Sequence, residues 1–282
     1  MRLVSSILAY SSSRQCGGID LCSTSMKPTE RARLLPLLRL DWGVDGARFA
    51  LKNGDIVVIV DTLRFSTAVT TAVACGFTIY PVGDQAEGRT LAASMGAEMS
   101  GKPGKAKYTI SPHSYLRALP DDNRQVVLYS PNGAACTSLA TDDDIVYIGC
   151  FLNARAVGRL VSEISRELLK SVTIVAAGEQ RAIDTGERIV YDKLAAYPIF
   201  AIEDYLASGA IINHTELEKS AEARLCQLTY ECARDQIEDL LFDSFSGRYL
   251  VENDLAEDIT YAARLDVFDT VPSMHHGKIA KS

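Results

Sequence analysis

The chain has 282 residues, of which 47% are hydrophobic and 23% charged, and its net charge at pH 7 is −7. These values are typical of a globular protein with a sizeable core, and the acidic balance argues against a nucleic-acid-binding protein. No apolar run approaches the roughly 20 residues of a membrane span, and the seven cysteines form no Cys-x-x-Cys pair. We therefore expect reduced thiols, a cytoplasmic location and no membrane contact.

The first 37 residues differ in composition from the rest. Clusters of serine and glycine at 11–13, 17–18 and 23–25 follow a short apolar start that serines interrupt. This pattern predicts a poorly ordered leader over residues 1–37 and argues against a secretory signal peptide. Residues 38–282 contain no repeat and no obvious linker, so we expect a single α/β domain there.

Predicted strands and helices alternate along the first part of this domain. Strands are expected at 56–60, 78–82, 126–129, 145–148 and 172–176, and helices at 67–74, 85–95 and 153–169. Further helices are expected at 203–212, 216–241 and 255–263. The alternation predicts a three-layer α/β/α fold with a mainly parallel sheet and a helical C-terminal part.

The most informative stretch follows the predicted strand Ile56–Val60. Five apolar, mostly β-branched residues lead into Asp61, Arg64, Ser66 and Thr67. A carboxylate, a guanidinium and two hydroxyls at the carboxyl end of a parallel strand are what a phosphate or metal site requires, and such strand ends bind ligands in open α/β sheets. The alternative is that the hydroxyls only cap the next helix, which would leave Asp61 and Arg64 unexplained.

Other predicted strand ends also carry polar residues. Asn132 and Gly133 follow one strand, Asn153 follows the next, and Glu179 follows the strand at 172–176. Parallel strands bring these ends to one edge, so the side chains are expected in one cleft. Taken singly, Asn132-Gly133 is also a common turn pair and Asn153 a good helix N-cap.

Two adjacent carboxylates, Glu203 and Asp204, open a predicted helix. Neighbouring helical side chains point about 100° apart, so both can bind one metal ion only if the helix end faces it. Negative charge in a first helical turn also favours the helix dipole without any ligand. We expect metal or substrate contact here, with the dipole as the alternative.

A set of short motifs in order along the chain resembles the 2-phosphosulfolactate phosphatase family. The motifs are Asp41–Ala47, Val60–Ala68, Ser111–Pro112 with Tyr115, Pro131–Gly133 with Ala135, Gly149–Ala154, Ala177–Glu179, Glu203–Asp204 with Ser208–Ile211, Ser246–Arg248, Asp258, Leu265–Asp266 and Val271–Pro272. They run from about residue 41 to 279. No single motif is decisive, but their common order argues against chance.

The resemblance implies a magnesium-dependent phosphatase that removes phosphate from 2-phospho-3-sulfolactate, a step toward coenzyme M. This chain departs from the family pattern at Met99, where the family typically has arginine. Losing a guanidinium removes a bidentate partner for phosphate or sulfonate. Lys102, Lys105 and Lys107 lie close in sequence and could restore the positive charge.

We therefore expect a phosphatase acting on a small phosphorylated organic acid. Mg²⁺ would be held by Asp61 with one or more of Glu179, Glu203 and Asp204, with Arg64 stabilising the transferred group. The expected catalytic residues are Asp61, Arg64 and Glu179, the metal ligands Asp61, Glu203 and Asp204, and the substrate-binding residues Ser66, Thr67, Ser111, Asn132, Gly133 and Asn153. Attack by water and a covalent aspartyl route through Asp61 both stay open.

Two further expectations concern association and activity. We expect a small-molecule phosphomonoester as the partner and no nucleic acid, and the sequence is compatible with a homodimer. The alternative from another functional class is a catalytically altered homologue that binds a small organic acid without hydrolysing it, suggested by the altered region from Gly96 to Pro112.

Overall fold

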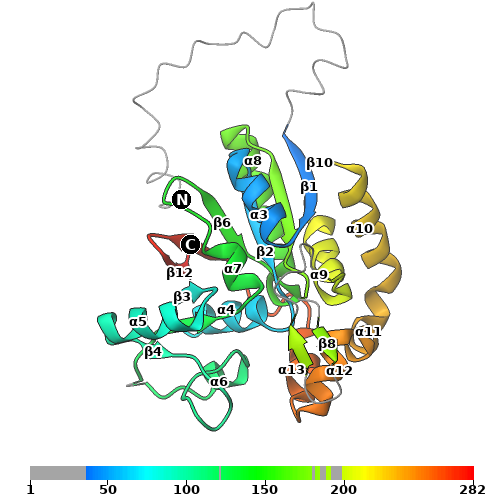
Figure 1. Cartoon of the computed structure of the whole chain (residues 1–282). Helices are drawn as coiled ribbons and strands as arrows, with labels where there is room; N and C mark the ends of the chain where they lie inside the picture. The colour runs from blue at the N-terminus through cyan, green and yellow to red at the C-terminus, as the bar shows by residue number, and fades with distance from the viewer. Residues whose placement is uncertain (1–35, 121, 180–181, 185–188, 192–198) are drawn as a thin grey trace, which may run out of the picture. The chain divides into compact units, whose positions relative to one another are not determined.

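The computed structural model describes residues 36–282 apart from 121, 180–181, 185–188 and 192–198. Residues Pro36–Lys281 form one compact unit (Figure 1). The predicted leader, except its last two residues, lies outside the described residues. Among the described helices, none is long and apolar enough to cross a membrane.

Ten strands of the described chain form one mixed sheet, in the order β10-β1-β7-β2-β6-β11-β12-β3-β5-β4. Their bounds are β1 Leu37–Trp42, β2 Ile56–Val60, β3 Thr78–Val82, β4 Glu98–Met99, β5 Gln125–Tyr129, β6 Ile145–Ile148, β7 Val172–Ala176, β10 Glu218–Lys219, β11 Pro272–His275 and β12 Lys278–Lys281. All neighbours are parallel except the hairpin β11–β12, which is antiparallel within itself and to β6 and β3. Two short strands, β8 (Ala182–Asp184) and β9 (Ile189–Tyr191), pair separately.

Helices cover both faces of the sheet, which confirms the predicted three-layer α/β/α fold (Figure 1). Their bounds are α3 Gly43–Lys52, α4 Phe65–Ala74, α5 Gln85–Met95, α6 His113–Leu116, α7 Gly133–Thr137, α8 Ala154–Leu168, α9 Ile202–Asn213, α10 Ala221–Ala233, α11 Ile237–Asp243, α12 Phe245–Glu252 and α13 Ala256–Ala262, with 3₁₀ turns η1 at Phe151–Asn153 and η2 at Arg234–Gln236. The predicted helical C-terminal part is therefore present from α9 to α13.

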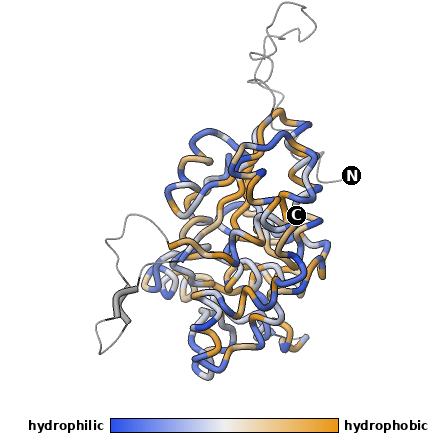
Figure 2. The backbone as a smooth tube through the Cα atoms, turned by 90° about the vertical axis from the view of Figure 1, so that its right-hand side faces the viewer, coloured by the Kyte–Doolittle hydropathy of each residue, from blue (hydrophilic) through white to orange (hydrophobic). Residues whose placement is uncertain are grey.

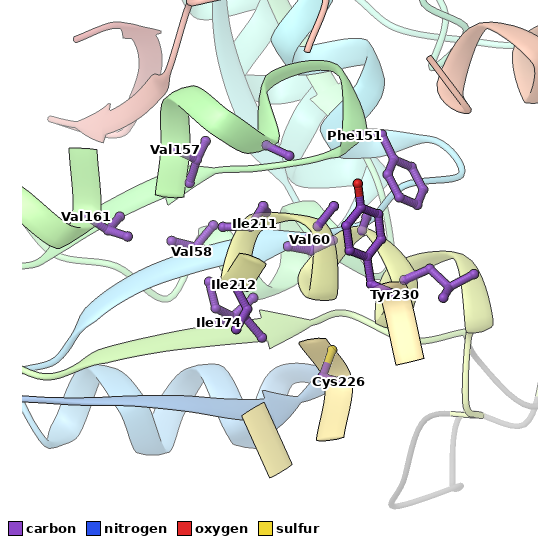
Figure 3. Close-up of a cluster of buried hydrophobic side chains, with 14 of the residues drawn as sticks. Val58, Val60, Phe151, Val157, Val161, Ile174, Ile211, Ile212, Cys226 and Tyr230 are labelled. Carbon is purple, nitrogen blue, oxygen red and sulfur yellow. The ribbon is translucent and has the colours of Figure 1, made fainter. Parts of the chain in front are cut away.

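The central strand β2 shows how the sheet joins two cores. All five of its residues are buried, because successive side chains point to opposite faces and helices cover both. Val58 and Val60 pack in a cluster with residues of α8, α9 and α10 (Figure 3). Val57 and Ile59 pack in a second cluster with α3 and α4. Hydrophobic residues are correspondingly concentrated along the inner strands, with hydrophilic residues around them (Figure 2).

Helix α4 is buried on every side. Every residue from Phe65 to Val73 is buried, and the helix contains no charged residue. It contacts β6, β11, β12 and β3, as well as α6, α7 and η1. A helix that is apolar or small all round belongs in a core rather than on a surface. Because β2 leads into this helix, the loop between them is anchored at both ends by buried elements.

Two sequence expectations need correction. The single helix expected at 216–241 is divided into β10, α10, η2 and α11. Helices α3 and α12 were not predicted. The exposed pair His275-His276 lies at the turn of the β11–β12 hairpin, where the ring of His276 contacts Asp142 at 2.8 Å.

Gly209 provides a test of how α9 packs on α10. A Cβ atom at this position would lie 2.6 Å from the carbonyl oxygen of Cys226 and 2.6 Å from Cβ of Tyr230. Because one obstacle is backbone, Gly209→Ala should lower the free energy of unfolding by about 1–3 kcal/mol, measured by urea denaturation. Glu231→Ala, at an exposed position of α10, is the control, with a change within about 0.5 kcal/mol. An unchanged midpoint for Gly209→Ala would contradict this packing.

Candidate functional site

The loop after β2 places the carboxylate of Asp61 where two helices begin. Its Oδ1 accepts a hydrogen bond from the N–H of Phe65 at 3.2 Å, at the start of α4. Its Oδ2 accepts from the N–H of Gly133 at 2.7 Å and from the hydroxyl of Ser130 at 3.2 Å, both after β5. The side chain is therefore almost completely enclosed, with the residue 5% exposed. The ends of β2 and β5 meet at this carboxylate.

Gly133 is needed for this approach. A Cβ atom there would lie 2.4 Å from the ring of Phe65 and 2.7 Å from Oδ2 of Asp61. Only a residue without a side chain can bring its N–H so close to the carboxylate. The Asn132-Gly133 pair is thus more than a turn, because the backbone of Gly133 binds the first predicted site residue.

Helix α9 brings its first two carboxylates to the same edge of the sheet. Oδ1 of Asp204 accepts the N–H of Thr62 at 2.7 Å, and Oδ2 accepts the N–H of Gly178 at 3.0 Å. Asp204 therefore joins the loops after β2 and β7. The hydroxyl of Thr62 donates to the carbonyl of Glu203 at 3.2 Å. Both acidic residues are 3% exposed, so a favourable interaction with the dipole at an exposed helix end does not explain them.

Glu179, after β7, completes a group of four carboxylates, which we call the acidic cluster: Asp61, Glu179, Glu203 and Asp204. The Asn132 amide donates to Oε1 of Glu179 at 2.9 Å. Glu179 is half-buried, in contrast with the other three. The structure therefore brings the predicted catalytic and metal-binding carboxylates together from β2, β7 and α9.

The cluster is electrostatically strained. Burial, opposed by the Gly133 N–H and assisted by the charge of Glu179, raises the pKa of Asp61 from its ordinary 3.8 to about 6. Burial and the charges of Asp61 and Glu203 raise the pKa of Asp204 well above its usual range. Burial also raises the pKa of Glu203, with the charge of Glu179 adding to it and Ser246 opposing it. A cation among these groups would relieve both burial and repulsion.

Arg64 lies in a second group that Asp258 organises. Nη1 of Arg64 pairs with Oδ2 of Asp258 at 2.7 Å, and the hydroxyl of Ser111 donates to Oδ1 at 2.6 Å. Asp258 is fully buried on α13, and Nε2 of His113 lies 3.9 Å from its Oδ1. The predicted residues Arg64 and Ser111 are therefore linked through a carboxylate to which the sequence assigned no role. The sequence signal that could have revealed this role is an acidic residue, Asp258, next to the apolar Ile259 in a short helix, which suggests a buried carboxylate.

Three predicted substrate-binding residues are engaged with backbone instead. The hydroxyl of Ser66 donates to the carbonyl of Ile59 and accepts the N–H of Asp61, and Thr67 donates to the carbonyl of Thr62. The amide of Asn153 accepts the N–H of Cys150 and donates to the carbonyls of Ile148 and Thr270. These side chains order the strand ends, so the structure gives no support to direct substrate contacts by them. Neither hydroxyl caps α4, whose first N–H bonds to Asp61.

Met99 also has a packing role. It lies on β4 in an apolar cluster with Val82, Ala92 and Val127, on the face that α5 covers. Its Cε would lie 2.8 Å from a Cβ atom placed on Gly88. The methionine that replaces the family arginine thus fills space between β4 and α5.

The acidic cluster offers carboxylate oxygens that a magnesium ion can use as ligands. Among the described residues, no three His, Cys, Asp or Glu side chains are arranged as a ready metal cage. Magnesium commonly uses only one or two protein carboxylates and takes its other oxygen ligands from water and phosphate. Buried carboxylates with raised pKa values at one edge of the sheet fit that mode of binding, and the donor set is all oxygen.

A cavity of about 300 Å³ lies beside the second group. Its lining includes Ser111, His113, Arg117, Lys107 and Glu257. The side chains come from the segment between β4 and β5 and from the start of α13. Both charge signs are present, because Lys107 pairs with Asp122 and Arg117 lies 3.8 Å from Glu257. The cavity therefore adjoins the Ser111–Asp258 contact without a strong excess of one charge.

Comparisons with known proteins identify what the chain is similar to. A family model described as 2-phosphosulpholactate phosphatase matches residues 46–277. A protein of Carboxydothermus hydrogenoformans named "Probable 2-phosphosulfolactate phosphatase" is 28% identical over 236 residues, 80% of this chain and 89% of the relative. Proteins with the same name from Pseudothermotoga lettingae (27% over 223 residues, 77% and 88%) and Caldanaerobacter subterraneus subsp. tengcongensis (25% over 239 residues, 80% and 90%) are also similar.

The raised pKa of Asp61 predicts how stability depends on pH without a divalent cation. Between about pH 4 and 6 the folded state keeps a proton that the unfolded state releases, so the free energy of unfolding falls as pH rises through this window. The contribution of Asp61 is about 3 kcal/mol. Denaturant titrations in EDTA at several pH values measure it, and Asp61→Asn should flatten the slope. Equal slopes for wild type and variant would contradict the titration of Asp61 in this range.

Proposed function

The chain belongs to the 2-phosphosulfolactate phosphatase family, and on this basis we propose that it is a magnesium-dependent phosphatase that hydrolyses a phosphomonoester of a small organic acid. The observation that carries the proposal is the acidic cluster, where four carboxylates from three elements meet with Arg64 only three residues from Asp61. A buried anionic cluster and a guanidinium carried by the same loop suit a cation and a phosphate together. Cytoplasmic location and the homodimer stay predictions from the sequence.

Asp61, Glu203 and Asp204 are the carboxylates that we propose for magnesium. Both oxygens of Asp204 also accept backbone N–H groups, which fixes the ends of β2 and β7. When bound, magnesium would offset the negative charge of the phosphate oxygens and lower the barrier to attack by water. Neutralisation of the cluster would also lower the raised pKa values of its carboxyl groups.

Glu179 is the proposed base. It is the least buried member of the acidic cluster, and the amide of Asn132 fixes its orientation. A carboxylate at the open side of the cluster can take the proton from attacking water while the buried members hold the cation. Oδ2 of Asp61 accepts two hydrogen bonds and Oδ1 one, which reduces its nucleophilicity. These contacts favour the water route over the covalent aspartyl route.

Arg64 would stabilise charge on the transferred group. A guanidinium carries five N–H donors, and its contact with Asp258 leaves others for phosphate oxygens. Asp258 is buried and also accepts from Ser111, so it limits the positions that Arg64 can adopt. The guanidinium is thereby positioned before substrate binds, which lowers the reorganisation needed in the transition state.

The first functional test combines activity with binding. The protein should hydrolyse p-nitrophenyl phosphate with Mg²⁺ and lose this activity in EDTA, and Asp61→Asn should lower kcat by at least about a hundredfold. Mg²⁺ should raise Tm more at pH 7.5 than at pH 5, because it binds deprotonated carboxylates, and Asp61→Asn should abolish this rise. Asp45→Asn, at an exposed carboxylate, is the control.

Two outcomes would change the assignment. Equal magnesium affinity in wild type and Asp61→Asn, measured by calorimetry, would remove Asp61 from the metal site. No turnover of any phosphomonoester, together with tight binding of an organic acid, would favour the binding-protein alternative. Turnover of 2-phospho-3-sulfolactate in preference to other phosphorylated hydroxy acids would identify the substrate named for the relatives.

The role of Arg64 is tested with its partner. Arg64→Lys keeps the charge but loses the fork, so kcat should fall by about tenfold or more, equivalent to about 1.4 kcal/mol. Asp258→Asn should also lower kcat more than it raises KM, and the double variant should be no worse than the worse single variant. Arg48→Lys and Asp45→Asn, in an exposed ion pair, form the matched control. Additive losses at Arg64 and Asp258 would show that they act independently.

A further inference from the structure

The outer side of α10 carries an apolar stripe that no described part of the chain covers. Leu225 is 60% exposed and Leu228 is 51% exposed, and Cys232 is exposed one turn further along. Residues three and four positions apart lie on one side of a helix, so these three side chains form a continuous strip. We call it the α10 stripe. Figure 1 shows α10 outside α9, at the margin of the helical part.

The inner side of the same helix is firmly attached. Ala223, Cys226 and Tyr230 are buried in the core cluster shared with α9 (Figure 3). A Cβ atom at Gly209 of α9 would lie 2.6 Å from the backbone of α10. The missing side chain therefore lets the two helices pack closely. The orientation of α10 is thus fixed by one face, and the apolar side chains of the other face cannot turn inward. An exposed strip of this kind on a fixed helix indicates an interaction surface.

The charges beside the stripe indicate its partner. Arg224 and Glu231 lie on the same flank of the α10 stripe, on either side of Leu228 in the sequence. Within the chain Arg224 lies 3.6 Å from Glu218 and Glu231 accepts a hydrogen bond from the amide of Gln227, and both contacts are at the exposed surface. If two copies of α10 pack antiparallel about a two-fold axis at Leu228, Arg224 of each copy lies beside Glu231 of the other. The same arrangement places Leu228 against Leu228 and Leu225 against Cys232. An isologous interface must be self-complementary in this way.

We propose that the α10 stripe is the interface between two copies of this chain, which pack as antiparallel α10 helices about a two-fold axis at Leu228. Leucine contacts supply the apolar centre, and two symmetric Arg224–Glu231 pairs fix the antiparallel direction. Charge pairs at the edge of an interface contribute mainly to orientation and specificity. In a parallel arrangement Arg224 would lie at the same height along the helix axis as Arg224 of the other copy, and Glu231 at the same height as Glu231. The opposite charges would then not pair, which disfavours this arrangement.

Charge reversal tests the orientation. In analytical ultracentrifugation of the full chain, wild type should be a dimer whose population falls on dilution. Arg224→Glu and Glu231→Arg should each weaken dimerisation by about tenfold or more, and the double variant should restore it, because the pairs are re-formed with opposite sign. Arg166→Glu, at an exposed arginine on α8, is the control and should leave the dimer unchanged.

Cross-linking tests the position of the axis. Leu228→Cys should form a disulfide between two copies on mild oxidation, because the two-fold axis brings this position face to face with itself. The native Cys232 should not, since the two copies lie about 12 Å apart along the helix axis, beyond disulfide reach. The cross-link is made in the Cys232→Ser background, and Leu169→Cys, at the exposed leucine that follows α8, should give none.

The outcomes are decisive. A wild-type monomer at all concentrations up to the millimolar range overturns the proposal, as does a dimer that survives both charge reversals. Ready cross-linking through native Cys232 without Leu228→Cys overturns the two-fold axis at Leu228. A monomer that becomes a dimer only after removal of residues 1–35 assigns the stripe to the chain's own N-terminal segment and equally overturns it. Circular dichroism confirms that each variant is folded.

Discussion

The enclosed carboxylate of Asp61 is the contact on which the arrangement of the site depends. It accepts the N–H groups at the starts of α4 and α7, so one side chain orders the loops after β2 and β5. Asp204 does the same for the loops after β2 and β7. Charge-assisted hydrogen bonds to backbone are strong enough to hold such loops. Both carboxylates are buried, however, and burial raises the pKa of each. The two carboxylates that order the loops of the site are therefore also the groups that a bound cation would stabilise most.

The second group holds its positive charge apart from the acidic cluster. Arg64 follows in the same loop, but its guanidinium pairs with Asp258 rather than with the acidic cluster. This separation keeps the cluster open for a cation while holding a guanidinium nearby for an anion. Helix α4 makes the separation possible, because its burial on all sides fixes the loop that carries both Asp61 and Arg64. The core and the site are thus parts of one packing arrangement.

Much of the fold followed from local pattern. β2, β3, β6 and β7 have the bounds that their apolar runs predicted, since parallel strands buried on both faces contain few polar residues. The β11–β12 hairpin was missed, although His276-Gly277 carries the positive φ pair of a tight hairpin turn, at 50° and 72°. The division of the predicted helix at 216–241 was also missed, because its apolar spacing continues through η2 and does not mark the change of direction.

The convergence of the carboxylates could be predicted from the ends of strands and of one helix. Asp61 and Glu179 follow parallel strands that end at one edge, Glu203 and Asp204 open a helix, and hydrogen bonds link Asp61, Asp204 and Glu179 to the loops at that edge. The partner of Arg64, by contrast, lies on an element far along the chain, because Asp258 is 194 positions after Arg64. Ser66, Thr67 and Asn153 have residue types that suit a ligand, yet the carbonyl groups that they bond to take position only in the folded chain. Sequence shows donors and acceptors, but not which of them the fold occupies.

The place of the β11–β12 hairpin has a consequence for how the chain acquires this structure. Its two strands come last in the described sequence but lie between β6 and β3, in the middle of the sheet. During synthesis the group β1, β2, β6 and β7 and the group β3, β4 and β5 emerge first, and the strands that join them edge to edge emerge afterwards. Until then β6 and β3 each present an unpaired edge, which can associate with other chains. Folding yield on the ribosome is therefore expected to depend on how quickly residues 272–281 are delivered to that gap.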